Sequence, residues 1–290
     1  MPWRASLASW LSLTPALLVV GLLFGASLFS GVAQSLGDLA IIGESRLSLD
    51  AYTNLLLGTT PAGREFWPAL GFSLWVSGAA TLLSALGALL LAVALSGRQL
   101  ASGANVLALN LNLALPHLVW AIAISLLLAQ SGLIARLAAA LGLISAPAEF
   151  PVLVRDRYGL GIIMHYLSKE IPFLTLILLA VLRTQGAAYN LVAENLGASF
   201  WQRLRYVTLP LVLPGLAAGA LLVFAFTFGA YEVPALLGVR YPRTLAVLAL
   251  ELFTNPDLHS RSEAMAISLV MALVVISLAG LARIFRREFD

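Results

Sequence analysis

The sequence predicts an all-α integral membrane protein with six transmembrane helices. The 290-residue chain is 60% hydrophobic and only 11% charged, whereas a soluble domain carries about 25% charged residues. Six apolar segments are each long enough for the ~20 residues that a membrane-spanning helix needs. Irregular backbone or an open sheet edge facing lipid would leave polar groups unpaired, so each segment is expected to be a helix.

The composition also excludes several kinds of function. A formal charge of +3, carried by scattered arginines, does not indicate nucleic-acid binding. The absence of cysteine excludes disulfides, thiolate metal sites and cysteine nucleophiles. Lys169 is the only lysine, and no Gly-x-x-x-x-Gly-Lys-Ser/Thr loop occurs. The chain is therefore not expected to bind ATP in the P-loop manner.

The first span is predicted over about residues 11–32. It is longer than the ~7–15-residue apolar core of a cleaved signal peptide, so we expect it to be retained. A polar segment, 33–67, follows it. Within this segment, residues 47–57 are predicted to form a short amphipathic helix capped at Ser48 or Asp50.

Five further apolar spans follow in order. They are predicted over residues 68–96, 104–129, 159–182, 209–237 and 264–284. A brief turn with Arg98 joins the second span to the third, whereas a longer connection, 131–158, follows the third. An even number of spans puts both termini on one side, together with Arg98 and the 183–208 loop. From the charge pattern we assign that side to the cytoplasm.

The loop between the fourth and fifth spans is predicted to contain two short helices. Residues 191–196 form the first, and Gly197 stands where a helix end favours a residue tolerant of positive φ. Ser199 followed by Gln202 is a capping-box pattern, so a second helix should start at once and lead to Pro210. Such a pair at a membrane surface indicates a contact for another protein. The alternative is an amphipathic helix that lies on lipid headgroups.

The spacing in this loop matches a known pattern: Glu-Ala-Ala, three residues, Gly, nine residues, Ile, one residue, Leu-Pro. Ala193 stands at the second alanine, Gly197 at the glycine, Val207 at the isoleucine and Leu209-Pro210 at the end. On these residues the chain resembles the permease subunits of binding-protein-dependent ABC importers.

The chain departs from that pattern at its first residues. The leading Glu-Ala falls on Leu191 and Val192. Glu194 lies three positions later, on the same helical face one turn along. Either it takes over the acidic role, or this subunit couples less strongly to its ATPase. Three other segments, 48–56, 169–173 and 241–245, resemble the permeases for polyamines, ferric iron and phosphonates, so the similarity covers nearly the whole chain.

The resemblance implies a type I importer permease architecture with a cytoplasmic coupling helix in a bacterial inner membrane. Residues 1–67 would hold the first helix and a periplasmic segment, 68–284 a five-helix permease core with the coupling loop at 184–208, and 285–290 a basic tail. The implied partners are an ABC ATPase dimer, which carries ATP and Mg, a second permease subunit and a periplasmic solute-binding protein. The implied coupling residues are Leu191, Ala193, Glu194, Gly197, Ser199, Val207, Leu209 and Pro210.

Polar groups at membrane depth mark candidate path residues, because they normally face a bundle interior or a wet path. Lys169 and Glu170 lie near mid-depth of the fourth span, and either form ion pairs between helices or line the path. Pro116 should kink the third span and free a backbone carbonyl. Asn112 and His117 either bond that carbonyl or another helix, or contact the solute.

Two further candidates lie near the outer end of the fifth span. Tyr231 and Glu232 either gate the path or are an ordinary interfacial aromatic and acid. His117 has no second histidine or acid at metal-ligand spacing in the sequence, which argues against a metal site. The candidate path residues are thus Asn112, His117, Lys169, Glu170, Tyr231 and Glu232.

The sequence leaves alternatives for both function and solute. An ion-driven secondary transporter would not need the coupling loop, and an intramembrane enzyme would need a nucleophile with its base; no Gly-x-Ser-Gly motif occurs. The expected solute is a polyamine, a phosphonate, ferric iron or a similar small solute. Lys169 favours an anion, whereas Glu170 and Glu232 favour a cation.

Overall fold

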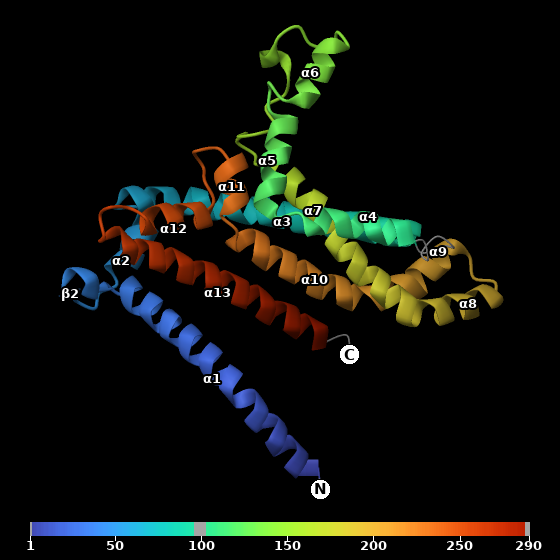
Figure 1. Ribbon diagram of the computed structural model, residues 1–290, viewed down its shortest axis with the longest axis horizontal. Coiled ribbons are helices and arrows are strands. Elements are labelled where there is room, and N and C mark those ends of the chain that lie inside the picture. Colours follow the sequence, from blue (N-terminus) through green and yellow to red (C-terminus); the bar gives the residue numbers. More distant parts are fainter. Residues whose placement is uncertain (1, 96–102, 288–290) are drawn as a thin grey trace. The chain divides into compact units, whose positions relative to one another are not determined.

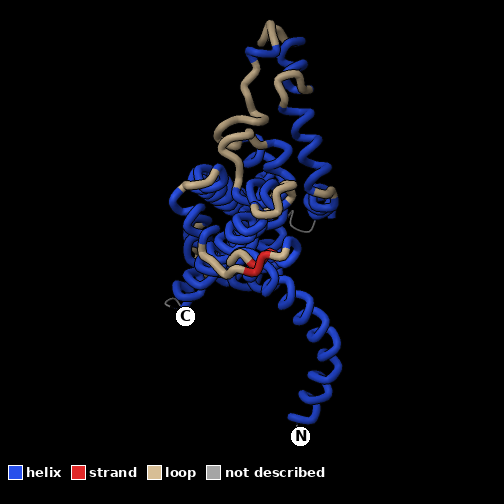
Figure 2. Tube along the Cα trace, turned by 90° about the vertical axis from the view of Figure 1, so that its left-hand side faces the viewer, coloured by secondary structure: helices blue, strands red, loops and turns tan. Residues whose placement is uncertain are grey.

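The structure, a computed structural model, describes residues 2–95 and 103–287. Most of the described chain is helical, and its strands form one short hairpin (Figure 2). Six helical stretches in the described part are long and apolar enough to cross a membrane, which confirms the predicted number of spans: Ser12–Ser35, Pro61–Leu95, His117–Ala140, Leu160–Thr184, Phe200–Gly229 and Ser260–Arg283. The predicted turn with Arg98 and the end of the basic tail, 288–290, lie outside the described residues.

The chain divides into two units, the first made of residues 1–66 with 248–272. Its elements are α1 (Pro2–Ser35), β1 (Asp38–Leu39), β2 (Glu44–Ser45), α2 (Asp50–Leu57), the start of α3, the end of α12 and the first part of α13. Gly37 (φ +89°) turns the chain from α1 into the hairpin, and a Cβ there would lie 2.8 Å from the Arg46 carbonyl oxygen. The Tyr52 hydroxyl donates to Ser35 Oγ at 2.9 Å and holds α2 to the end of α1.

The predicted cap of α2 was wrong. The N-cap residue is Leu49, and no side chain caps the helix. Ser48 Oγ lies 3.4 Å from the Asp50 amide nitrogen, one position too early in the chain to serve as the N-cap acceptor. The helix itself forms where the amphipathic pattern predicts it.

The second unit contains residues 67–247 and 273–290. Its elements are most of α3 (Pro61–Leu95), α4 (Gly103–Ala114), α5 (His117–Leu128), α6 (Leu133–Ala140), α7 (Leu160–Val181), α8 (Ala187–Asn195), α9 (Phe200–Arg203), α10 (Leu209–Gly229), α11 (Glu232–Leu237), the start of α12 (Leu245–Phe253) and the rest of α13 (Ser260–Arg287). α7 lies at its centre, in contact with α4, α5, α10 and α11 (Figure 1).

Two apolar clusters pack on α7. One combines it with α3, α5 and α11, and the other with α3 and α10. Gly159, in the left-handed region at φ +71°, is the N-cap of α7. This places the fourth span where the sequence predicted it. The core of the unit is therefore built around the one span that also carries Lys169 and Glu170.

The third span differs from its prediction over residues 104–129. The helix is interrupted between α4 and α5. Pro116 is extended (φ −58°, ψ 143°) and is the N-cap of α5. Proline has no N–H to continue the helix and disfavours helical geometry in the residue before it. The 12 residues of α4 rise only about 18 Å, so the third membrane-crossing stretch is instead residues 117–140.

The fifth span ends earlier than the predicted residue 237. α10 stops at Gly229, Ala230 is extended (ψ 135°), and α11 begins at Glu232. Both candidates therefore lie beyond the end of α10: Tyr231 is in the break as the N-cap of α11, and Glu232 is the first residue of α11.

Candidate functional site

The loop between α7 and α10 contains the two predicted helices, α8 and α9. Gly197 follows α8 at φ +78°. Its amide donates to the Glu194 carbonyl at 2.9 Å, and the Ala198 amide donates to the Ala193 carbonyl at 2.9 Å. These are the paired bonds of a Schellman helix end. The glycine stop predicted from the sequence is confirmed.

α9 starts at the predicted capping box. The Ser199 amide donates to Gln202 Oε1 at 2.8 Å, and the Gln202 amide donates to Ser199 Oγ at 3.4 Å. Two π-helical turns, Leu182–Gly186 and Leu204–Thr208, flank the pair of helices. The second turn runs directly into α10, so the joint between α8 and α9 is fixed on both sides and is continuous with a spanning helix.

Glu194 has a partner within the loop. Its carboxylate lies 2.9 Å from the Arg203 guanidinium and joins α8 to α9. The Glu194 side chain is 64% exposed, so a second partner can still reach it. The contact of Glu194 with another subunit stays a prediction.

Three of the remaining coupling candidates, Ala193, Val207 and Pro210, line an apolar groove. Leu191, Gly197, Ser199 and Pro210 are exposed, and Ala193, Val207 and Leu209 are half-buried. The groove has a volume of about 520 Å³ and is lined by Tyr189, Val192, Ala193, Leu196, Tyr206, Val207, Pro210 and Leu211. This surface offers apolar side chains to another protein beside the ion pair of the loop.

The buried Lys169 bonds to the carboxyl end of α4. Its ammonium donates to the carbonyls of Asn112 and Leu115, both at 2.6 Å, and the residue is 1% exposed. Pro116 leaves carbonyls of α4 without helical partners, and a cation is favoured at this end of the helix dipole. The sequence predicted a freed carbonyl at Pro116, but the donors it offered for that carbonyl were side-chain amides or His117 and not Lys169.

Asn112 and His117 have other partners. The Asn112 side-chain amide donates to the Ser168 carbonyl. His117 Nδ1 lies 3.3 Å from His165 Nε2, although the two residues are 48 positions apart. In residues 2–95 and 103–287, no group of three or more potential metal ligands comes together.

His165 is the residue that the sequence reading missed. It is fully buried on α7, four positions before Lys169. That spacing puts both side chains on one helix face, and is the signal that could have revealed it. Trp120 Nε1 also donates to Ser168 Oγ at 2.6 Å. Five polar contacts therefore tie α4, α5 and the break between them to α7.

A cavity of about 350 Å³ opens beside this junction. It is lined by Leu113, His117, Lys169, Glu170, Phe173, Leu222, Val223 and Phe226. Three of the six candidate path residues therefore line one cavity, and Asn112 is bonded to Lys169 beside it. Tyr231 and Glu232 are exposed and are not among the lining residues.

Residues 109–290 match the family described as "Binding-protein-dependent transport system inner membrane component". The chain is 31% identical to the molybdenum transport system permease protein ModB of Mycobacterium tuberculosis, over 74% of this chain and 77% of ModB. It is also 31% identical to the inner membrane ABC transporter permease protein YnjC of Escherichia coli, over 61% of this chain. The matched part spans only 33% of the length of YnjC.

The fold agrees with these relatives. A chain of the crystal structure of a bacterial alginate ABC transporter, in complex with an alginate pentasaccharide-bound periplasmic protein, superposes with a TM-score of 0.72 at 16% identity, over 97% of each chain. The type I importer permease architecture predicted from the loop is confirmed. The family is one of transport components of the inner membrane, in agreement with six spans. This chain belongs to the family of inner membrane components of binding-protein-dependent transport systems, and is a permease of the ABC importer kind.

Proposed function

We propose that this permease forms half of a translocation path for a small charged solute and is driven by a separate ATPase through the α8–α9 loop. Its partners are a second permease subunit of the same or a paralogous kind, two ATPase subunits that carry ATP and Mg, and a periplasmic solute-binding protein. Both termini and the α8–α9 loop face the cytoplasm. Residues 1–67, 68–284 and 285–290 act as the first helix with a periplasmic segment, the permease core and the basic tail.

The observation that carries this proposal is the fixed joint between α8 and α9. A short helix transmits a push only if its ends are held. The glycine stop, the capping box and the Glu194–Arg203 ion pair hold them here. The loop continues into α10, which packs on α7. Movement of the loop would therefore reach the cavity between these two helices.

The cavity beside α4, α5, α7 and α10 supports the proposed path. α10 contributes Leu222, Val223 and Phe226 to its wall, opposite Lys169 and Glu170 of α7. A tilt of α10 against α7 would change the width of the cavity. This is the geometry that alternating access requires near a helix break.

We place an oxyanion first among the possible solutes. ModB, which shares 31% identity with this chain, is named for molybdenum transport. The Lys169 ammonium at the cavity wall favours an anion. Glu170 in the same wall keeps a polyamine as the second candidate.

The test is reconstitution of the permease with its ATPase and binding protein in proteoliposomes. We expect ATP-dependent uptake of molybdate that exceeds uptake of a phosphonate, ferric iron or spermidine, measured with radiolabelled or elemental detection. Preferred uptake of spermidine would reject the oxyanion but keep the importer. Uptake that needs an ion gradient and no ATPase would reject the proposed coupling and indicate a secondary transporter.

A further inference from the structure

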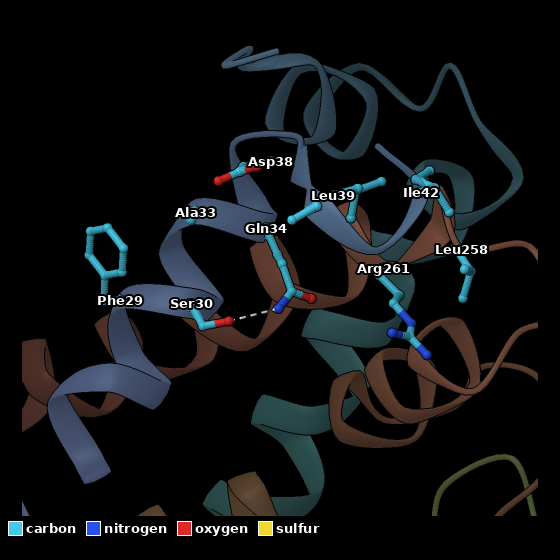
Figure 3. Close-up of a pocket in the computed structure, with 10 residues that line it drawn as sticks. Phe29, Ser30, Ala33, Gln34, Asp38, Leu39, Ile42, Leu258 and Arg261 are labelled. Atoms are coloured by element: carbon cyan, nitrogen blue, oxygen red, sulfur yellow. Dashed lines mark hydrogen bonds between the residues drawn. The ribbon is translucent and has the colours of Figure 1, made fainter. Parts of the chain in front are cut away.

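A second pocket lies in the first unit, where the end of α1 meets the β1–β2 hairpin and the start of α13 (Figure 3). Its volume is about 270 Å³, and its lining combines apolar and polar side chains: Phe29, Ser30, Ala33, Gln34, Asp38, Leu39, Ala40, Ile42, Leu258 and Arg261. None of these residues belongs to the α8–α9 loop or to the cavity beside Lys169. The proposed transport mechanism does not use this pocket.

From the ends of the spans, we expect the pocket to lie at the level of lipid headgroups. The membrane-crossing part of α1 ends at Ser35, and that of α13 begins at Ser260, so the pocket residues of both helices lie at the same end of their spans. Phe29 is 76% exposed, as expected for a side chain that faces acyl chains. A molecule in this pocket would therefore be partly in the apolar region and partly at the polar surface.

Arg261 provides a positive charge with an unsatisfied donor. Its guanidinium carbon lies 5.0 Å from the centroid of the Phe253 ring, which fixes the guanidinium against an apolar surface. Its Nε is buried and has no hydrogen-bond partner in the described part of the chain. A buried charged donor without an acceptor is unfavourable, and phosphate is the acceptor that best matches the planar guanidinium fork.

Ser30 and Asp38 provide the other polar groups. The Gln34 side-chain amide donates to Ser30 Oγ at 2.9 Å, which leaves the Ser30 hydroxyl hydrogen able to donate to an acceptor in the pocket. Asp38, on β1, lies on the other side of Gln34 from Arg261 (Figure 3). The pocket thus presents a cation and a carboxylate at separate positions beside an apolar wall.

We propose that this pocket binds a zwitterionic phospholipid. Its phosphate accepts hydrogen bonds from Arg261 and Ser30, its headgroup ammonium contacts Asp38, and an acyl chain lies along Phe29 and α1. The two opposite charges favour a headgroup that carries both. Phosphatidylglycerol would place no cation at Asp38, and free phosphate would leave both Asp38 and the apolar wall without a role.

The experiment uses the full chain purified in nanodiscs that contain equal parts of phosphatidylethanolamine and phosphatidylglycerol. Bound lipids are counted by native mass spectrometry after release into detergent. Arg261→Gln should reduce the retained phosphatidylethanolamine about tenfold, the effect of losing one charged hydrogen bond. Asp38→Asn should keep lipid binding but remove the preference over phosphatidylglycerol. The control is Arg240→Gln, which changes an exposed arginine outside the pocket. It should leave both the retained phosphatidylethanolamine and the preference over phosphatidylglycerol unchanged.

Three results would overturn the proposal. One is equal lipid retention by Arg261→Gln and Arg240→Gln. Another is a wild-type preference for phosphatidylglycerol, and the third is displacement of the lipid by millimolar inorganic phosphate. If Arg261→Gln does not fold, Arg261→Lys, which keeps the charge but not the fork, should bind less lipid than wild type. Unchanged lipid binding by Arg261→Lys, together with an unchanged lipid preference in Asp38→Asn, would also reject the site.

Discussion

The α8–α9 loop and the junction of α4, α5 and α7 are both held by polar contacts, but over very different distances along the chain. The Glu194–Arg203 pair of the loop joins residues nine positions apart, whereas Lys169 bonds to carbonyls 54 and 57 positions away. The loop contacts are exposed to water, and the junction is buried at membrane depth. A buried polar group has no water to replace a lost partner. Loss of a contact in the junction should therefore destabilise the protein much more than loss of a contact in the loop.

The largest effect is expected at the junction. Lys169→Met keeps the length of the side chain but leaves the Asn112 and Leu115 carbonyls without their donor. Each buried unsatisfied group costs about 1–3 kcal/mol, so the change should destabilise the protein by roughly 2–6 kcal/mol. Thermal unfolding of the detergent-purified chain, followed by circular dichroism, measures this loss.

Arg183→Met is the matched control for Lys169→Met. It also removes one cation, but from an exposed position at the end of the fourth span. We expect a much smaller shift in its unfolding temperature. Equal shifts for the two variants would show that the carbonyl contacts of Lys169 contribute little, and the contrast between junction and loop would be lost.

The sequence predicted the loop better than the junction, because the contacts of the loop join residues close together in the chain and those of the junction do not. Gly197 and the Ser199–Gln202 box act on neighbours within a few residues, so their pattern is complete in the local sequence. Pro116 also predicted a break, but the donor that satisfies the break comes from α7. Which of several polar residues meets it depends on how the helices pack. His165 was missed because its partner, His117, lies 48 positions away.

The second largest effect is expected at Gly197. A valine there must adopt φ +78°, which costs about 1–2 kcal/mol in the left-handed region. No atom lies within 4 Å of the added Cβ, so the change alters the joint of the loop without a steric clash. We expect normal membrane expression with strongly reduced ATP-dependent uptake, measured in proteoliposomes.

Gly142→Val is the control for Gly197→Val. Gly142 has φ +71° and equally open surroundings, but it lies in the connection after α6 and away from the loop. Its backbone strain should be similar, and its uptake should stay close to wild type. If both variants lose uptake equally, strain alone explains the result and the coupling role of the loop is not supported.

A smaller effect is expected from the capping box. Loss of a cap costs about 1 kcal/mol. The bond to Gln202 Oε1 is short at 2.8 Å, whereas the bond to Ser199 Oγ is 3.4 Å. Gln202→Ala should therefore reduce uptake at least as much as Ser199→Ala. A large loss with Ser199→Ala and none with Gln202→Ala would contradict this order and indicate a direct contact of Ser199 with a partner.

The smallest effect on stability is expected from the ion pair of the loop. An exposed pair contributes about 0.2–1 kcal/mol and weakens as salt screens it. A double-mutant cycle of Glu194→Gln and Arg203→Gln should give a coupling energy in that range, and the energy should fall towards zero at about 1 M salt. The same variants also separate two roles of Glu194, because ATPase stimulation can be measured on each of them. If the carboxylate only joins α8 to α9, Glu194→Gln and Arg203→Gln should reduce stimulation equally, since either change breaks the pair. If Glu194 also contacts the ATPase, Glu194→Gln should reduce stimulation much more than Arg203→Gln does, although the two variants are equally stable.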